Sequence, residues 1–167
     1  MNLQFTKTRK KHNWVRATHE GKTLASFPWP SHPGLPHDLI HCVVESEFRL
    51  KHGFWGLVSD GVDLLRINKS LGQATRNEIT ELSEQNLHEL YLSEALVASF
   101  QTDFWSETIT SQRRRELIKK YCAEWKIDAP REYESEILEI TDRKLAHLHQ
   151  QWKKLEVGKA LHLNFLD

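Results

Sequence analysis

The sequence is short of the residues that mark specialised classes of protein. It has two cysteines, seven glycines and one methionine, and lysine plus arginine equal aspartate plus glutamate at 23 each. This balance leaves no overall electric field to draw the protein to nucleic acid or to an anionic membrane. Any such binding would have to come from a local patch of charge.

The two cysteines, Cys42 and Cys122, lie far apart, and neither belongs to a CxxC or another metal-binding spacing. Both fall inside apolar helical patterns, so we expect buried free thiols. Free thiols suit a reducing compartment, and we expect a cytoplasmic protein. The basic residues 1–13 have no apolar stretch behind them and do not predict a secretory signal. No window reaches the roughly 18 apolar residues of a membrane span, so we expect no membrane partner.

Glycine-based motifs are missing as well. The chain has no GxGxxG, no GxxxxGK[ST] and no GxSxG, which are the loops that cradle phosphates or present a nucleophilic serine. With 39% hydrophobic and 28% charged residues, the composition is that of a globular protein. A length of 167 residues favours a single domain that covers residues 1–167.

Both ends of the chain show the alternation of apolar and polar residues that is typical of β-strands. The first thirty residues predict strands around a turn at Gly21. Residues 28–36 contain four of the five prolines, which exclude a helix or an inner strand and indicate an extended connector. Residues 158–166 alternate again. This last strand needs a partner, so we predict that it joins the N-terminal strands in one antiparallel sheet.

Between these strands the apolar residues recur with a helical period. The pattern predicts about five helices, covering residues 36–51, a short segment from residue 54, and residues 76–101, 110–127 and 131–155. A polar turn is expected at residues 68–77. The expected fold class is therefore α+β, with a small antiparallel sheet packed against about five helices.

The most distinctive stretch is PHDLIHCVVESEF at residues 36–48. At about 100° per residue, four polar side chains share an arc of about 100° on a helix, opposite an apolar side. They are His37, Asp38, His41 and Glu45. Two imidazoles one turn apart can direct their nitrogens to one point, as the Zn²⁺ ligands of HExxH helices do. The pattern predicts a divalent-metal site, for example for zinc, with His37, His41 and Glu45 as ligands.

Asp38 stands where an HExxH helix has its catalytic glutamate, so the string looks like an HDxxH variant. A carboxylate there can orient an imidazole or act as a base on bound water. Aspartate is one methylene shorter, so protease activity does not simply carry over. One alternative interpretation is an ordinary polar face, because the helix dipole favours an aspartate in the first turn and Glu45 can pair with Arg49. The other is a polar binding site.

Residues 34–57 also carry a resemblance. The string GLPHDLIHCVVESEF, followed closely by GFWG, resembles a segment of small uncharacterised bacterial proteins. This resemblance implies a bacterial cytoplasmic protein and brings no activity with it.

The strongest basic patch is QRRRELIKK, in which Arg113, Arg114 and Arg115 precede two lysines. Such a patch is a candidate phosphate or nucleic-acid surface. It has no interleaved aromatic residues, and the chain has no recognised nucleic-acid module. Glutamates of the following helix can neutralise the patch instead.

Three functions are compatible with these observations. The neutral charge and the lack of strong motifs favour a non-catalytic binding or interaction protein, with a protein partner or a second copy of the chain. The first alternative is a metal-dependent, hydrolase-like site on the helix with Asp38 as orienter or base. The second is a nucleic-acid-associated protein that works through Arg113–Arg115, which the neutral total charge disfavours.

Overall fold

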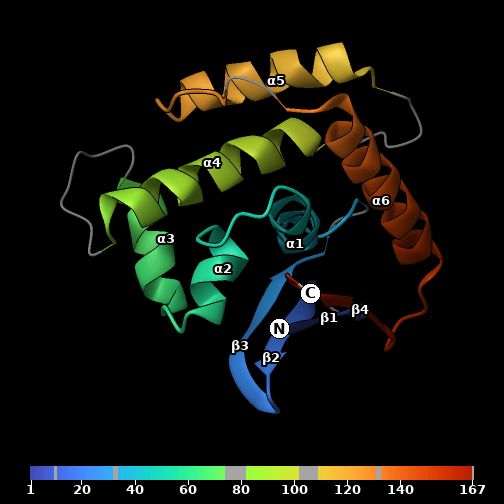
Figure 1. Ribbon diagram of the computed structural model, residues 1–167. Helices are drawn as coiled ribbons and strands as arrows, with labels where there is room; N and C mark the ends of the chain where they lie inside the picture. The colour runs from blue at the N-terminus through green and yellow to red at the C-terminus, as the bar shows by residue number, and fades with distance from the viewer. Residues whose placement is uncertain (10, 32–33, 74–81, 102–108, 131–132, 167) are drawn as a thin grey trace.

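The structure, a computed structural model, describes residues 1–9, 11–31, 34–73, 82–101, 109–130 and 133–166 (Figure 1). Three strands come first, six helices follow and a fourth strand ends the order. The elements are β1 (Asn2–Thr6), β2 (His12–His19), β3 (Lys22–Pro30), α1 (His37–Glu47), α2 (Phe54–Ser59), α3 (Leu64–Gln73), α4 (Glu84–Phe100), α5 (Ser111–Glu124), α6 (Ser135–Lys154) and β4 (Ala160–Asn164). The fold is α+β, as the sequence predicts. None of the described helices is both long and apolar enough to cross a membrane.

The four strands form one antiparallel sheet in the order β3-β2-β1-β4. The last strand pairs with the first, so that Leu3 lies opposite Leu163 and Phe5 opposite Leu161. The prediction that the C-terminal strand joins the N-terminal ones is confirmed. Alternate residues of β1 and β2 are buried beneath the helices, and the two chain ends lie side by side (Figure 1).

Two of the prolines lie inside β3, at Pro28 and Pro30. Because β3 is an edge strand, a missing backbone N–H can face away from the sheet without loss of a ladder bond. The segment expected to be an extended connector therefore starts as strand. Trp29, between the two prolines, packs against Trp152 of α6 with ring centroids 5.8 Å apart, which ties this edge strand to the last helix.

Helix α1 is the central helix of the molecule. It lies between the sheet and α4, with α6 beside it and α5 on the far side of α4 (Figure 1). Every residue from Leu39 to Glu45 is buried, so its polar side is covered as well as its apolar side. The helix ends at Glu47 rather than near residue 51, because Arg49 adopts a left-handed backbone conformation with φ 53°.

One expected turn is wrong in part. Residues 68–73 belong to α3, although a polar turn was predicted at 68–77. The helix begins where the Asp63 carboxylate accepts a hydrogen bond from the Leu65 N–H at 2.7 Å, and Ile67 anchors it in the core. The rest of that turn and the start expected for the next helix, at residue 76, lie outside the described residues. Helix α4 begins at Glu84, where Ser83 caps it.

Candidate metal centre

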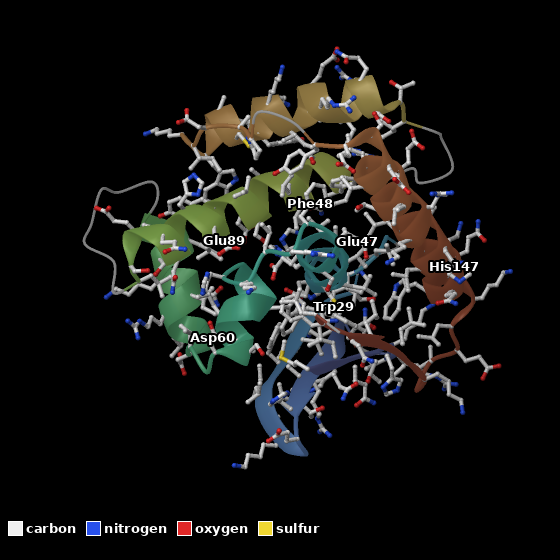
Figure 2. The ribbon with its side chains drawn as sticks, in the orientation of Figure 1. Trp29, Glu47, Phe48, Asp60, Glu89 and His147 are labelled. Atoms are coloured by element: carbon white, nitrogen blue, oxygen red, sulfur yellow. The ribbon has the colours of Figure 1, made fainter. Side chains whose placement is uncertain are left out.

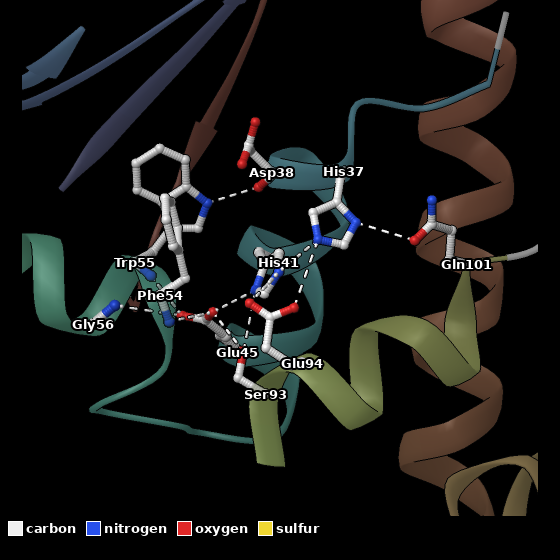
Figure 3. A network of polar contacts seen from close by, with 10 residues as sticks. All are labelled: His37, Asp38, His41, Glu45, Phe54, Trp55, Gly56, Ser93, Glu94 and Gln101. Carbon is white, nitrogen blue, oxygen red and sulfur yellow. Dashed lines mark hydrogen bonds and ion pairs between the residues drawn. The ribbon is translucent and has the colours of Figure 1, made fainter. Parts of the chain in front are cut away.

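Three side chains from two helices meet on the covered polar side of α1. The Nε2 atoms of His37 and His41 are 3.1 Å apart. Glu94 of α4 brings one carboxylate oxygen to 3.8 Å from His37 Nε2 and the other to 3.6 Å from His41 Nε2 (Figure 3). These three residues are called the His37–His41–Glu94 cluster below, and they are the group of possible metal ligands found among the described residues.

The spacing within the cluster suits a small cation. A tetrahedral zinc ion with bonds of about 2.0–2.1 Å places its donor atoms about 3.3 Å from one another. The three separations in the cluster, 3.1, 3.6 and 3.8 Å, lie around that value. The two longer separations run to different oxygens of Glu94, and one donor atom from each residue gives a group whose atoms lie within 4.8 Å of one another, so the side chains must still draw together around an ion.

Hydrogen bonds at the other ring nitrogens fix how the two imidazoles are protonated. His41 Nδ1 lies 2.9 Å from Glu45 Oε1, and His37 Nδ1 lies 3.1 Å from Gln101 Oε1. Because both partners are acceptors, each Nδ1 carries the hydrogen and donates it. The two Nε2 atoms therefore face one another beside Glu94, and a second hydrogen on His41 can bridge the 3.1 Å between them. A carboxylate behind a histidine is also the common outer partner of metal-bound imidazoles.

Glu45 is fully buried, and its carboxylate is held from several sides. It accepts hydrogen bonds from the backbone N–H groups of Phe54 at 2.8 Å and Trp55 at 3.0 Å, at the start of α2. The Ser93 hydroxyl donates to it at 2.7 Å. The sequence predicted Glu45 as the third metal ligand, but its oxygens are taken up by these donors. Glu94 is instead the third member of the cluster, and Glu45 orients His41.

The packing around Glu45 explains the glycines of GFWG. A Cβ atom on Gly53 would lie 2.5 Å from the carboxyl carbon of Glu45. A Cβ atom on Gly56 would lie 2.0 Å from the Lys51 carbonyl oxygen. Both positions need glycine, because α2 must come close enough to bring its first N–H groups to Glu45. Glu45 of α1 and the GFWG segment at residues 53–56 thus together hold His41 in place.

The charges of the cluster are coupled. Burial lowers the pKa of His41, but Glu94 and the hydrogen bond to Glu45 outweigh burial and raise the pKa to about 10. Burial raises the pKa of Glu94, and the neighbouring His41 and His37 more than reverse this, so its pKa lies below the usual range. In the ion-free protein His41 is therefore positively charged, with a second proton on Nε2 that a metal ion would have to displace.

One side of the cluster is open to solvent. The His37 side chain is 45% exposed, whereas that of Glu94 is 13% exposed and that of His41 only 2%. Structural zinc sites are closed by four protein ligands, and catalytic sites keep a position for water or substrate beside three. The cluster has three candidate ligands, one of them exposed, which is the arrangement of a catalytic zinc site.

Asp38 does not join the cluster. Its carboxylate points away from Glu94 (Figure 3), and no hydrogen bond or ion pair connects it to either imidazole in the described part of the chain. Burial raises the pKa of Asp38, partly offset by the charges of His41 and His37. Its backbone carbonyl accepts a hydrogen bond from Trp55 Nε1 at 2.7 Å. No contact supports the predicted role of orienter or base.

A second histidine–carboxylate contact lies nearby on the same helix. Glu89 of α4 accepts a hydrogen bond from the Lys51 N–H at 2.8 Å, and its other oxygen is 2.6 Å from His52 Nδ1. Asp60, the residue after α2, is 4.0 Å from His52 Nε2. Figure 2 labels Glu89 and Asp60. These three side chains contact one another in sequence and do not converge on one point, so they are not a candidate metal site. A variant of Glu89 can therefore serve as a control for a variant of Glu94.

The basic patch of α5 is used within the protein. Arg113 is exposed and pairs with Glu116 at 3.0 Å, while Arg115 donates to the Tyr133 carbonyl at 3.0 Å. Arg114 is fully buried and binds Asp142 and a backbone carbonyl of α4. The prediction that Arg114 belongs to a nucleic-acid surface is therefore corrected, because a buried guanidinium cannot reach a phosphate.

Glu94 was missed by reasoning from the sequence, because it lies more than fifty residues from the histidines. A local signal exists at this position. The pair Ser93–Glu94 interrupts an apolar run, LYLSEALV, in the middle of a helix. A polar pair at the buried side of a helix has to meet a polar partner, and here the partner is the polar stripe of α1.

Comparison with protein-family models, with curated proteins and with solved structures finds no match for this chain. The cluster and its surroundings therefore carry the argument about function by themselves.

Proposed function

We propose that this protein binds a divalent metal ion such as zinc through His37, His41 and Glu94, at a site of the hydrolytic type. The observation that carries the proposal is the convergence of two imidazole Nε2 atoms and one carboxylate. Two Nε2 atoms 3.1 Å apart need a hydrogen or a cation between or beside them, because their lone pairs would otherwise repel. A proton on His41 meets this need in part, and a metal ion meets it for all three groups at once.

Each residue has a distinct task in this proposal. Glu45 and Gln101 hold the two rings with their Nε2 atoms toward the ion, and Glu94 supplies negative charge. The exposed side at His37 admits water or a substrate. A divalent ion held here supplies Lewis-acid chemistry. The arrangement departs from an HExxH site, since the acid comes from a separate helix and not from the residue after the first histidine.

The bacterial and cytoplasmic setting expected from the sequence stays part of the proposal. Cys42 and Cys122 are both free and buried, which supports a reducing compartment.

The test is metal binding by protein that has been stripped with a chelator. Zinc, manganese, cobalt and nickel are titrated in a calorimeter, and bound metal is counted by mass spectrometry after dialysis. Glu94→Gln keeps the shape of the side chain and removes its charge. Zinc should bind to the natural sequence and bind about tenfold or more weakly to this variant, since even outer partners of metal ligands are worth that much.

Glu89→Gln is the matched control, because Glu89 lies on the same helix and contacts a histidine outside the cluster. It should bind zinc as the natural sequence does. If no ion binds, or if Glu94→Gln binds as well as the natural sequence, the metal proposal is overturned. The interaction protein favoured by the sequence then becomes the function to pursue.

Activity is measured on the loaded protein with a panel of carboxylic esters, phosphoesters and amides. Hydrolysis of one class by the natural sequence, lost in Glu94→Gln and kept in Glu89→Gln, is the expected result. Stoichiometric metal without hydrolysis of any class would leave metal binding in place and remove the enzymatic part of the proposal.

A further inference from the structure

A cavity of about 840 Å³ lies between the edge strand β3 and helices α2 and α3. Its volume falls in the range of about 300–1,000 Å³ that is usual for small-molecule sites. Apolar side chains make up much of its described wall, among them Leu24, Phe27, Phe54 and Leu65. Asp38 and Asp63 bring two carboxylates, and none of the described lining residues is a lysine, arginine or histidine.

The two carboxylates differ in how they are engaged. Asp63 accepts a hydrogen bond from the Leu65 N–H at 2.7 Å and holds the start of α3. The carboxylate of Asp38 forms no hydrogen bond or ion pair with a side chain of the described residues, and it points away from the metal cluster (Figure 3). The charges of His41 and His37 partly offset the burial of Asp38, but neither imidazole forms a hydrogen bond with its carboxylate, so an ammonium group in the cavity can supply the direct partner that it lacks.

The rim of the cavity exposes large apolar side chains. Leu65 is 80% exposed and Leu24 is 38% exposed, and both line the cavity. Inside, the rings of Phe27 and Phe54 meet edge to face at 6.5 Å. Such walls match a ligand with an apolar body, and aromatic faces also favour a cationic group.

We propose that this cavity binds a small organic cation, a primary amine on an apolar body, with its ammonium group at Asp38. The site is separate from the metal cluster and does not rest on the proposed function. It also gives a task to Asp38, which the cluster does not use. Asp38 follows His37 in the chain, yet the two side chains point in different directions from the first turn of α1 (Figure 3).

The experiment compares three probes of one shape, 2-phenylethylamine, 2-phenylethanol and 3-phenylpropanoate, by calorimetry in the presence of a chelator. The amine should bind about tenfold more tightly than the alcohol, a difference of about 1.4 kcal/mol. The carboxylate should bind most weakly. In Asp38→Asn, the amine should lose most of its advantage over the alcohol, because the variant keeps the shape of the side chain and removes the charge of Asp38.

Two further variants keep the test decisive if Asp38→Asn does not fold. Leu65→Lys changes an exposed residue, so it should fold normally, and its tethered ammonium should compete with the amine and weaken its binding. His37→Ala should lose metal and keep the amine preference, which separates this site from the cluster. The proposal is overturned if the amine shows no saturable binding, binds no better than the alcohol, or keeps its preference in Asp38→Asn.

Discussion

At the scale of single residues, the orientation of the His41 ring depends on two residues outside the His37–His41–Glu94 cluster. Glu45 holds the ring through Nδ1, and Gly53 leaves room for the Glu45 carboxylate under the first turn of α2. The backbone at Gly53 has φ −66°, a value open to any residue. Its requirement for glycine is therefore one of space and not of conformation.

We predict that Gly53→Ala is destabilised by about 1–3 kcal/mol, the usual cost of overpacking a buried site. The new methyl group would press on the Glu45 carboxylate, displace His41 and weaken zinc binding at the same time. Urea unfolding and zinc titration measure the two effects. Gly72→Ala is the control, because a Cβ there meets nothing within 4 Å, and this variant should be unchanged or slightly more stable. Equal stability of the two variants would contradict the packing described for Gly53.

Of the site residues predicted from the sequence, His37 and His41 lie in the cluster, whereas Asp38 and Glu45 lie outside it. The spacing of His37 and His41 within one helix fixes their relation, and a sequence shows that directly. Which acid completes the cluster depends on where α4 lies, and whether Glu45 is free depends on how α2 turns back. Both depend on tertiary packing, which the periodicity of the sequence does not show.

At the scale of elements, a largely buried ion pair helps to join α4, α5 and α6. Arg114 of α5 binds Asp142 of α6 and the Ser99 carbonyl near the end of α4, and its guanidinium lies 4.3 Å from the centre of the Phe100 ring. A guanidinium with its donors in use and a ring beneath it is well suited to such a junction. Arg114, the middle residue of the basic triplet, thus holds these helices together.

We predict that Asp142→Asn costs about 3–5 kcal/mol of folding free energy, because it leaves a buried cation without its counter-charge. Arg113→Ala, one residue before Arg114, should change stability by less than about 0.5 kcal/mol, since the Arg113 side chain is 63% exposed. Denaturant unfolding of both variants measures the difference. A loss below 1 kcal/mol in Asp142→Asn, on the order of a surface pair, would show that the junction is not important for stability.

Most elements were predictable from local patterns, and the exception is instructive. The strands and the helices with a clear apolar stripe follow from periodicity. Helix α3 was taken in part for a turn because Asn68, Lys69 and Gly72 read as loop residues. Its start at Asp63 and the burial of Ile67 outweigh those preferences, which are worth only tenths of a kcal/mol each for Asn and Lys and about 1 kcal/mol for Gly.

At the scale of the whole molecule, protonation of the cluster couples stability to pH. The pKa of His41 is raised in the folded protein from 6.5 to about 10. A raised pKa stabilises the fold fully below the unfolded value, and this contribution is lost as pH rises toward the folded value. The ion-free protein should therefore lose stability between about pH 6.5 and 10.

We predict that this loss is seen in urea unfolding with a chelator present and is reduced when zinc is bound, because the ion replaces the proton between the same groups. In Glu94→Gln the His41 proton loses its main partner, so the decline should become smaller. A pH profile that is flat in this range, or identical with and without Glu94, would contradict the coupling of His41 to Glu94.

The pairing of the last strand with the first has a consequence for how the chain reaches its fold. Strand β1 is an inner strand only because β4 covers its outer edge, and β4 follows every described helix in the chain. During synthesis β1 can pair with β2 at once, yet its other edge stays open until residues 160–164 emerge. Contacts so distant in sequence slow folding, and an open strand edge invites association with other chains. The short strand β4 thus completes the sheet late in synthesis, when it pairs with the edge of β1 that was exposed until then.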